Sequence, residues 1–254
     1  MIKSILQYKL KATNAHGIHS PFVFEFYNEV LMASKNDAFP SIEKLRKALL
    51  TNESRIEIKD FGAGSRTNTS NDRSVKEMTK NASIDKKHGQ LLAKIIEHYD
   101  VQEILELGTS LGLGSAYLAS NAKHLTTIEG DRTTHELAVN NFEELNLNNI
   151  TAVCSTFDEF LEQQSQDQLS KFDLVYIDGN HSYEATMNYF NQFADAVNND
   201  AFLVFDDIRW SSGMEKAWQE IQASEKINVS IELMRMGIVV KRKEQEKQHF
   251  ILRF

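Results

Sequence analysis

The chain has 254 residues, of which 41% are hydrophobic, and its formal net charge is −8. This composition supports a folded core and excludes a disordered or low-complexity chain, while the acidic balance disfavours nucleic-acid partners, which select clustered Lys and Arg. No apolar run approaches the length of a membrane span, the first residues lack the apolar stretch of a secretory signal, and the lone Cys154 allows no internal disulfide, so we expect a cytoplasmic protein. The apolar neighbours of Cys154 predict that it is a small core residue.

Residues 1–82 are expected to form a helical cap or lid on the main domain, and residues 83–254 the main domain itself. Two helical patterns, 21–33 and 41–50, lie in the first segment, with Pro21 near the start of the first helix, where its missing N–H costs little. No Pro- or Gly-rich linker separates the two parts, so the cap is not expected to be an independent domain.

From residue 84 onward, helical and strand patterns alternate. An amphipathic helix is predicted at 84–99. Short runs that are hydrophobic through their centres predict parallel strands covered on both faces; they lie at 103–107, 124–129, 150–154, 172–178 and 201–207. Helical patterns follow them, one starting at Thr133, where Glu136 stands at capping-box spacing, and others at 157–163, 183–197 and 214–222.

This alternation predicts an α/β fold with a Rossmann-like, doubly wound, mostly parallel sheet. Two further strand patterns, 229–236 and 237–243, meet at Gly237 with no room for a helix between them, so we expect an antiparallel hairpin there. Residues 249–254 are expected to add an edge strand.

Two glycine-rich segments compete for the role of cofactor loop, DFGAGSR at 60–66 and ELGTSLGLGS at 106–115. A nucleotide loop needs a strand before it and a helix after it, because glycines let the backbone approach the ligand and the helix start supplies free N–H donors. Only the second segment has this context. We therefore predict that DFGAGSR is an ordinary glycine turn and not the cofactor loop.

Acidic residues around the second segment narrow the choice of cofactor. Glu129 ends the next strand, about twenty residues downstream, where a carboxylate accepts both ribose hydroxyls; NAD sites share this feature. Glu106, before the first glycine, suits the cationic amino-acid end of S-adenosylmethionine (SAM) and would repel a dinucleotide pyrophosphate. Glu106 is therefore the residue that favours SAM over NAD.

Three stretches resemble successive motifs of class I SAM-dependent methyltransferases: LELGTSLGLGSAYLA (105–119), TTIEGD (126–131) and FDLVYIDGNHSYE (172–184). The resemblance covers roughly residues 83–240, and the terminal hairpin fits the seven-stranded sheet of that class. The most similar groups are metal-dependent small-molecule O-methyltransferases of the catechol type and the bacterial macrolide-sugar type. HGIHSPFVFEFYNEV (16–30), which begins with HGIHSP (16–21), and DFGAGSR resemble a bacterial subfamily signature that implies no particular substrate.

The resemblance implies a set of cofactor contacts. Glu129 would hold the ribose, Thr156 and Phe157 would lie by the adenine, and Ile84 would close over the cofactor. Asp178 is expected at both the cofactor and the metal site. The methionine end would be lined by Glu106, Gly108, Thr109, Ser110, Gly112 and Gly114.

Three carboxylates end neighbouring strands: Asp178 follows one predicted strand, and Asp206 and Asp207 follow the next. Adjacent strands lie about 4.8 Å apart, so these side chains can converge on one cation, and without it they would repel one another. Hard divalent ions with oxygen ligands, chiefly Mg²⁺, fit such a set. Where the catechol type has Asn, this chain has Asp207, which agrees better with the sugar-modifying type.

His181, three residues after Asp178, is the expected general base. At that offset the catechol type carries a Lys base and the macrolide-sugar type a His. The expected reaction is methyl transfer from SAM to a metal-bound hydroxyl of a small molecule, with a homodimer as one possible assembly. Three alternatives stay open: a methyltransferase for RNA or protein, a SAM-fold ligand-binding protein without catalysis, and a metal-dependent hydroxylase. Trp210 and Trp218 fit either an acceptor wall or packing under the cap.

Overall fold

The computed structural model describes residues 2–59 and 71–254, so the DFGAGSR segment and the prediction made for it lie outside the described residues. The chain forms two compact units. Unit 1 consists of Met1–Met32 and Gln164–Phe254, and unit 2 of Ala33–Gln163. The expected boundary after residue 82 stays a prediction, and the two units divide the chain at other positions.

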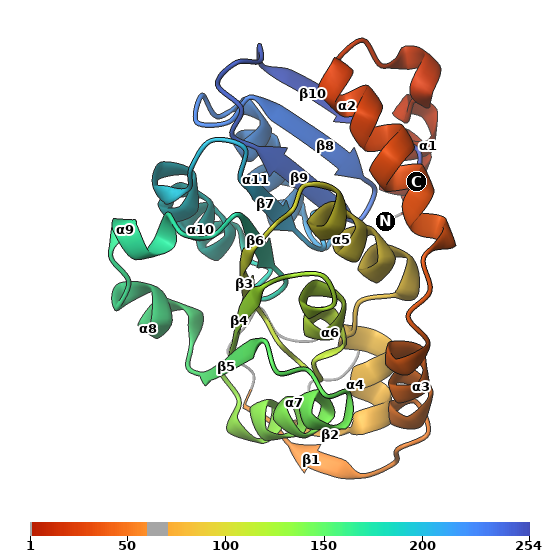
Figure 1. Ribbon diagram of the computed structural model, residues 1–254, viewed down its shortest axis with the longest axis vertical. Coiled ribbons are helices and arrows are strands. Elements are labelled where there is room, and N and C mark those ends of the chain that lie inside the picture. The colour runs from red at the N-terminus through yellow and green to blue at the C-terminus, as the bar shows by residue number, and fades with distance from the viewer. Residues whose placement is uncertain (1, 60–70) are drawn as a thin grey trace. The chain divides into compact units, whose positions relative to one another are not determined.

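Unit 2 is built on three parallel strands in the order β3-β4-β5. The predicted strand ranges are confirmed: β3 spans Glu103–Leu107, β4 His124–Glu129 and β5 Ile150–Cys154. The helices of this part are α5 (Lys86–His98), α6 (Leu113–Ala119), α7 (Arg132–Glu144) and α8 (Phe157–Glu162), and α5 packs against α6 (Figure 1). Leu92, Ile95 and Leu105 are fully buried and belong to the core of the unit.

Helix α7 begins earlier than its sequence pattern predicts. We expected a start at Thr133 with a Thr133–Glu136 capping box, and this prediction is wrong. Asp131 is the N-cap, and its Oδ1 accepts a hydrogen bond from the Thr134 backbone N–H at 2.8 Å. Glu136 pairs with Arg132 instead, at 3.0 Å. Asp and Thr are both good N-cap residues, so spacing alone did not choose between two candidates this close together.

The prediction that Cys154 is a core residue is also wrong, because its side chain is exposed. Its strand, β5, stands last in the strand order, and even its apolar residues are only partly covered. A run of apolar residues predicts a strand but does not tell a central strand from an edge strand.

The remaining elements of unit 2 precede α5. They are η3 (Ala33–Asn36), α3 (Pro40–Leu49), β1 (Arg55–Glu57), β2 (Asp72–Ser74) and α4 (Val75–Ala82). Strands β1 and β2 pair antiparallel as a separate two-stranded sheet. Helix α4 starts with a complete capping box between Ser74 and Glu77, and α3 buries Leu45 on its inner side.

Unit 1 holds five strands in the order β10-β8-β9-β7-β6. Strands β6 (Leu174–Ile177) and β7 (Phe202–Phe205) are parallel, β8 (Val229–Leu233) and β9 (Met236–Val240) form the predicted antiparallel hairpin, and β10 (Gln248–Ile251) adds the predicted edge strand, parallel to β8. The helices of this stretch are α9 (Gln166–Leu169), α10 (Tyr183–Ala196) and α11 (Ser212–Ala223). Apart from β1 and β2, the described residues of the two units contain eight strands, one more than the seven expected, and the added strand is β10.

We expected the hairpin to turn at Gly237, and this prediction is wrong. The chain turns at Met234, which has a φ of 66°, and Arg235, while Gly237 lies inside β9. A Cβ atom at residue 237 would lie 2.5 Å from the Trp218 ring. The glycine is therefore explained by close packing of an indole on the strand and not by the turn.

The first 32 residues pack within unit 1. They form α1 (Ile2–Lys11), η1 (Ala15–Gly17), α2 (Pro21–Glu25) and the π-helical turn η2 (Phe26–Met32). In HGIHSP, Ser20 caps α2 and accepts a hydrogen bond from the Gln245 side chain at 2.6 Å. Thr13 pairs with Leu252 in an isolated parallel bridge. Ser20 of the motif thus ties the start of α2 to the segment between β9 and β10.

The fold class is α/β with a mostly parallel sheet of the Rossmann-like kind, as the sequence predicts. Among the residues that the structure describes, no helix combines the length and the apolar character needed to cross a membrane.

Candidate active site

The cofactor-loop candidate links β3 to α6 through backbone conformations that favour glycine. Gly108 has a φ of 116°, Ser110 of 49° and Gly112 of 80°. Two features require glycine at position 112: its positive φ, and the Phe142 ring, from which a Cβ atom there would lie only 2.5 Å away. The loop leads into α6, which begins without a side-chain cap. The strand–glycine–helix context predicted for this segment is confirmed.

Glu129, at the end of β4, is tied to this loop. Its Oε2 accepts a hydrogen bond from the Ser110 backbone N–H at 2.9 Å, and its Oε1 accepts one from the Asp131 backbone N–H at 3.0 Å. Burial raises the pKa of Glu129, although these backbone donors act in the opposite direction. Gly130 supplies a third backbone donor to this carboxylate. A carboxylate can accept about four hydrogen bonds, so Glu129 keeps acceptor capacity for a ligand hydroxyl.

Glu106 lies in β3 with only 1% of its surface exposed. Its Oε2 accepts hydrogen bonds from the Ser115 hydroxyl and, at 2.6 Å, from the Thr127 hydroxyl, to which Thr109 donates in turn at 2.6 Å. Its Oε1 is buried without a partner. Burial, the largest effect, raises the pKa of Glu106 to about 8. A buried carboxylate oxygen without a donor fits the cationic amino group of SAM, which would satisfy it.

The other residues expected near the cofactor have the following places. Ile84 is buried and precedes the N-cap of α5. Gly114 lies in the first turn of α6. Thr156 caps α8 in a full capping box with Glu159, and Phe157 is the first residue of that helix. Their contacts with SAM stay predictions.

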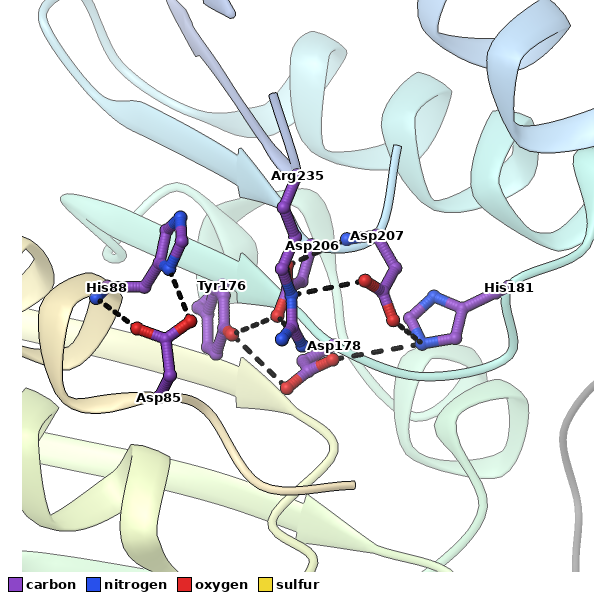
Figure 2. A network of polar contacts seen from close by, with 8 residues as sticks. All are labelled: Asp85, His88, Tyr176, Asp178, His181, Asp206, Asp207 and Arg235. Atoms are coloured by element: carbon purple, nitrogen blue, oxygen red, sulfur yellow. Dashed lines mark hydrogen bonds and ion pairs between the residues drawn. The ribbon is translucent and has the colours of Figure 1, made fainter. Parts of the chain in front are cut away.

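The three aspartates form a second cluster, in unit 1, which we call the acidic cluster (Asp178, Asp206, Asp207; Figure 2). Asp178 follows β6, and the other two follow β7. Tyr176 bridges the cluster, since its hydroxyl lies 3.1 Å from Asp178 Oδ2 and 3.0 Å from Asp206 Oδ2. Asp207 has a φ of 50°, and this left-handed conformation turns the chain immediately after the strand.

His181 faces the acidic cluster, as Figure 2 shows. Its Nε2 lies 3.8 Å from Asp178 Oδ1 and 3.9 Å from Asp207 Oδ2, and 20% of its side chain is exposed. Burial lowers the pKa of His181, although the nearby carboxylates of Asp207 and Asp206 oppose this effect. The Trp210 ring lies near the imidazole, with 6.1 Å between ring centroids. The sequence-predicted base and carboxylates thus come together.

Sequence reasoning missed Arg235. Its guanidinium lies inside the acidic cluster: Nε and Nη2 donate to Asp206 Oδ1 and Oδ2, both at 2.8 Å, and Nε lies 3.1 Å from Asp207 Oδ1 (Figure 2). The available signal was a single cationic residue between two strongly apolar strands, in a hairpin whose second strand pairs with β7.

The second tryptophan considered for the acceptor wall, Trp218, is buried, and its indole N–H donates to Glu232 at 3.0 Å.

The expected divalent metal does not fit the acidic cluster in this arrangement. Within residues 2–59 and 71–254, no group of three or more His, Cys, Asp or Glu side chains is arranged to hold a metal ion. A guanidinium occupies the position between the carboxylates at which a cation would bind. The metal stays a prediction, and the residues present argue against it.

Comparison with known proteins agrees with the fold and with the glycine loop. Residues 105–208 match a family model described as a methyltransferase domain. The SAH-bound methyltransferase PaMTH1 of Podospora anserina is similar with a TM-score of 0.62 and 11% identity, over 89% of this chain and 100% of that chain. The O-methyltransferase TomG of Streptomyces achromogenes, solved with SAM, has a TM-score of 0.60 and 15% identity, over 84% and 95%.

An O-methyltransferase of Bacillus cereus in complex with SAH has a TM-score of 0.59 and 15% identity, over 84% of this chain and 96% of that chain. No curated protein matches the sequence significantly. At these identities the solved structures share the fold with this chain, and the matched family model defines the domain. Residues 105–208 therefore resemble a methyltransferase domain, and the chain has the fold of solved SAM-dependent O-methyltransferases.

Proposed function

We propose that this protein transfers a methyl group from SAM to a hydroxyl of a small molecule. The observation that carries the proposal is His181, a partly exposed imidazole between Asp178 and Asp207 at the carboxyl ends of parallel strands. Open α/β sheets bind their ligands at this edge. An imidazole beside two carboxylates is suited to taking up a proton, because they stabilise the imidazolium that results.

The cofactor side of the proposal rests on the loop between β3 and α6. We expect Glu129 to accept the ribose hydroxyls and Glu106 Oε1 to accept the amino group, which would satisfy its buried, unpartnered oxygen. The positive-φ backbone at Gly108 and Gly112 lets the methionine end approach the chain closely. Bound SAM supplies a methyl group on a positively charged sulfur, which makes the methyl carbon electrophilic.

The acceptor side rests on His181. Its neutral form, which burial favours, would accept the hydroxyl proton at Nε2. The oxygen then forms a bond to the methyl carbon, the carbon–sulfur bond breaks, and the electron pair remains on sulfur, giving a methyl ether and S-adenosylhomocysteine (SAH). Trp210, beside the imidazole, is positioned to contact the acceptor. The expected Mg²⁺ is not part of this proposal, because Arg235 already occupies the space between the carboxylates.

A small acceptor is favoured over a macromolecule by charge. The net charge is −8, and the candidate acceptor site adds three carboxylates against one guanidinium. This field repels a phosphate backbone. Methylation of RNA is therefore the weaker alternative, and cytoplasmic location and a homodimer stay predictions.

The test is a screen of hydroxylated metabolites for SAH release, with products identified by mass and by NMR. With an acceptor in hand, His181→Ala should lower kcat by roughly 10²–10⁴-fold, the usual contribution of a general base, while SAH affinity stays within about twofold of wild type. His124→Ala is the matched control, because His124 lies at the start of β4 in unit 2, where its Nε2 is 3.2 Å from the Thr151 hydroxyl. Equal turnover of the His181→Ala and wild-type proteins would contradict the assigned base, and methyl groups found only on nitrogen would contradict O-methylation.

A further inference from the structure

Arg235 takes no part in the methyl transfer proposed above, yet it pairs with two of the three aspartates of the acidic cluster. We propose that its guanidinium is the resident cation of this site, so that the methyl transfer, if the proposed function is right, runs without a divalent metal. Arg235 would act as a positioning residue that holds Asp206 and Asp207, and through Asp207 sets the environment of His181.

The first support is that the Asp206 carboxylate is almost fully engaged by donors, including the Tyr176 hydroxyl that it shares with Asp178. Its Oδ1 accepts hydrogen bonds from Arg235 Nε at 2.8 Å and from the Asp207 backbone N–H at 2.7 Å. Its Oδ2 accepts from Arg235 Nη2 at 2.8 Å and from the Tyr176 hydroxyl at 3.0 Å. A carboxylate offers about four lone-pair directions, and the side chain of Asp206 is fully buried. A metal could bind this carboxylate only by displacing a bidentate guanidinium.

The second support is that the backbone holds Arg235 in place. The residue lies in the tight turn between β8 and β9, where its N–H donates to Leu233 O at 2.8 Å and its carbonyl accepts from the Ile208 N–H at 2.9 Å. Ile208 follows Asp207 directly, so the arginine and the carboxylates are fixed to one another through the main chain as well. Only 31% of the Arg235 side chain is exposed. Its planar group is suited to this two-point contact, which the point charge of Lys cannot reproduce.

The third support is that the two oxygens of Asp178, and likewise those of Asp207, have different partners. Asp178 has Oδ2 against the Tyr176 hydroxyl and Oδ1 toward His181. Asp207 has Oδ1 against Arg235 Nε and Oδ2 toward His181. Each carboxylate is thus held through one oxygen and presents the other to the imidazole. Arg235 therefore holds one oxygen of Asp207, as Tyr176 holds one oxygen of Asp178.

The inference is tested by Mn²⁺ binding to the full-length protein, measured by electron paramagnetic resonance, a readout that needs neither an acceptor nor activity. We expect no saturable Mn²⁺ site in the wild type. Arg235→Gln, which leaves three carboxylates without a cation, should gain one site per chain, and Arg235→Lys, which keeps the charge, should not. Arg209→Gln is the matched control, because Arg209 pairs with Glu215 and with the buried Glu232 and not with an aspartate of the acidic cluster; it should stay without a site.

SAH affinity reports whether each variant is folded and whether the cofactor half of the proposed function holds. A saturable one-to-one Mn²⁺ site in the wild type, lost in Asp206→Asn, would overturn the inference without any variant at Arg235. A folded Arg235→Gln protein that gains no site would overturn the claim that Arg235 excludes the metal. If neither the wild type nor any variant binds SAH, the proposed function is contradicted. The Mn²⁺ measurement still tests the inference about Arg235 in that case.

Discussion

Glu106 combines two properties that are costly together, since it is buried in a strand and one of its oxygens has no donor. An ionised carboxylate in such a place is destabilised, which is why burial raises its pKa to about 8. The hydroxyls of Ser115 and Thr127 offset part of this effect on the other oxygen. A cationic ligand group at Oε1 would stabilise the ionised form, so cofactor binding and proton release should be linked.

We therefore expect SAH binding at pH 7 to release close to one proton per chain. The sign follows from the raised pKa: below pH 8 the ligand-free carboxyl is protonated, the bound cation favours its ionised form, and the affinity for SAH rises with pH up to about 8. Calorimetry in two buffers of different ionisation enthalpy measures the released proton. Glu106→Gln should abolish the release and weaken SAH binding, whereas Glu103→Gln, at the other end of the same strand, should change neither. Identical heats in both buffers for the wild type would contradict the pairing.

Some candidate site residues could be predicted from the sequence and one, Arg235, could not. Glu106, Glu129 and His181 were predicted because each stands at a fixed offset from a strand end or a glycine. Arg235 was not, because its partner Asp206 is 29 positions away and the contact exists only once β9 pairs with β7. A like-charged cluster in a sequence indicates that some cation is needed, but the sequence does not say whether an ion or a side chain supplies it.

The hairpin of β8 and β9 shows the same limit for elements. The antiparallel pair was predicted from two apolar runs with no space for a helix, and the pairing is confirmed. The turn was placed at Gly237 because glycine is the usual turn residue. The actual turn uses Met234 at positive φ, and the glycine is needed where the Trp218 ring lies against β9. Packing between a helix and a strand decided this position, and no local pattern reports it.

Replacing Gly237 by Ala should therefore destabilise the protein. The added Cβ would lie 2.5 Å from Trp218 Cζ3, and moving that indole would strain its hydrogen bond to Glu232. Overpacking of this kind costs about 1–3 kcal/mol, measured as a lower midpoint in denaturant unfolding. Gly213→Ala is the control, since a Cβ there meets only ordinary contacts of 3.4 Å or more in the first turn of α11. Equal stability of the two variants would mean that Trp218 adjusts without cost.

At the scale of the molecule, the strands were predictable, whereas the expected boundary after residue 82 stays a prediction. Five strand ranges and the α/β class follow from alternating apolar and amphipathic runs, because parallel strands must be apolar on both faces. The first 82 residues carry no such marker, so they were assigned to a cap. The structure instead groups residues 1–32 with 164–254, through contacts such as the Thr13–Leu252 bridge between the first and last parts of the chain.

A fragment of residues 83–254 should consequently fail to fold cooperatively. It would lack buried apolar side chains of both units, among them Phe26, Val30, Leu31, Ile42, Leu45 and Leu49. Burying one such side chain contributes roughly 1.5–3 kcal/mol, so the loss is comparable to the whole stability of a typical domain, about 5–15 kcal/mol. Circular dichroism should show a sharp thermal transition for the full chain and a shallow one for the fragment. A fragment that melts sharply and binds SAH would restore the boundary after residue 82, and would reduce the N-terminal helices to the removable lid that the sequence suggested.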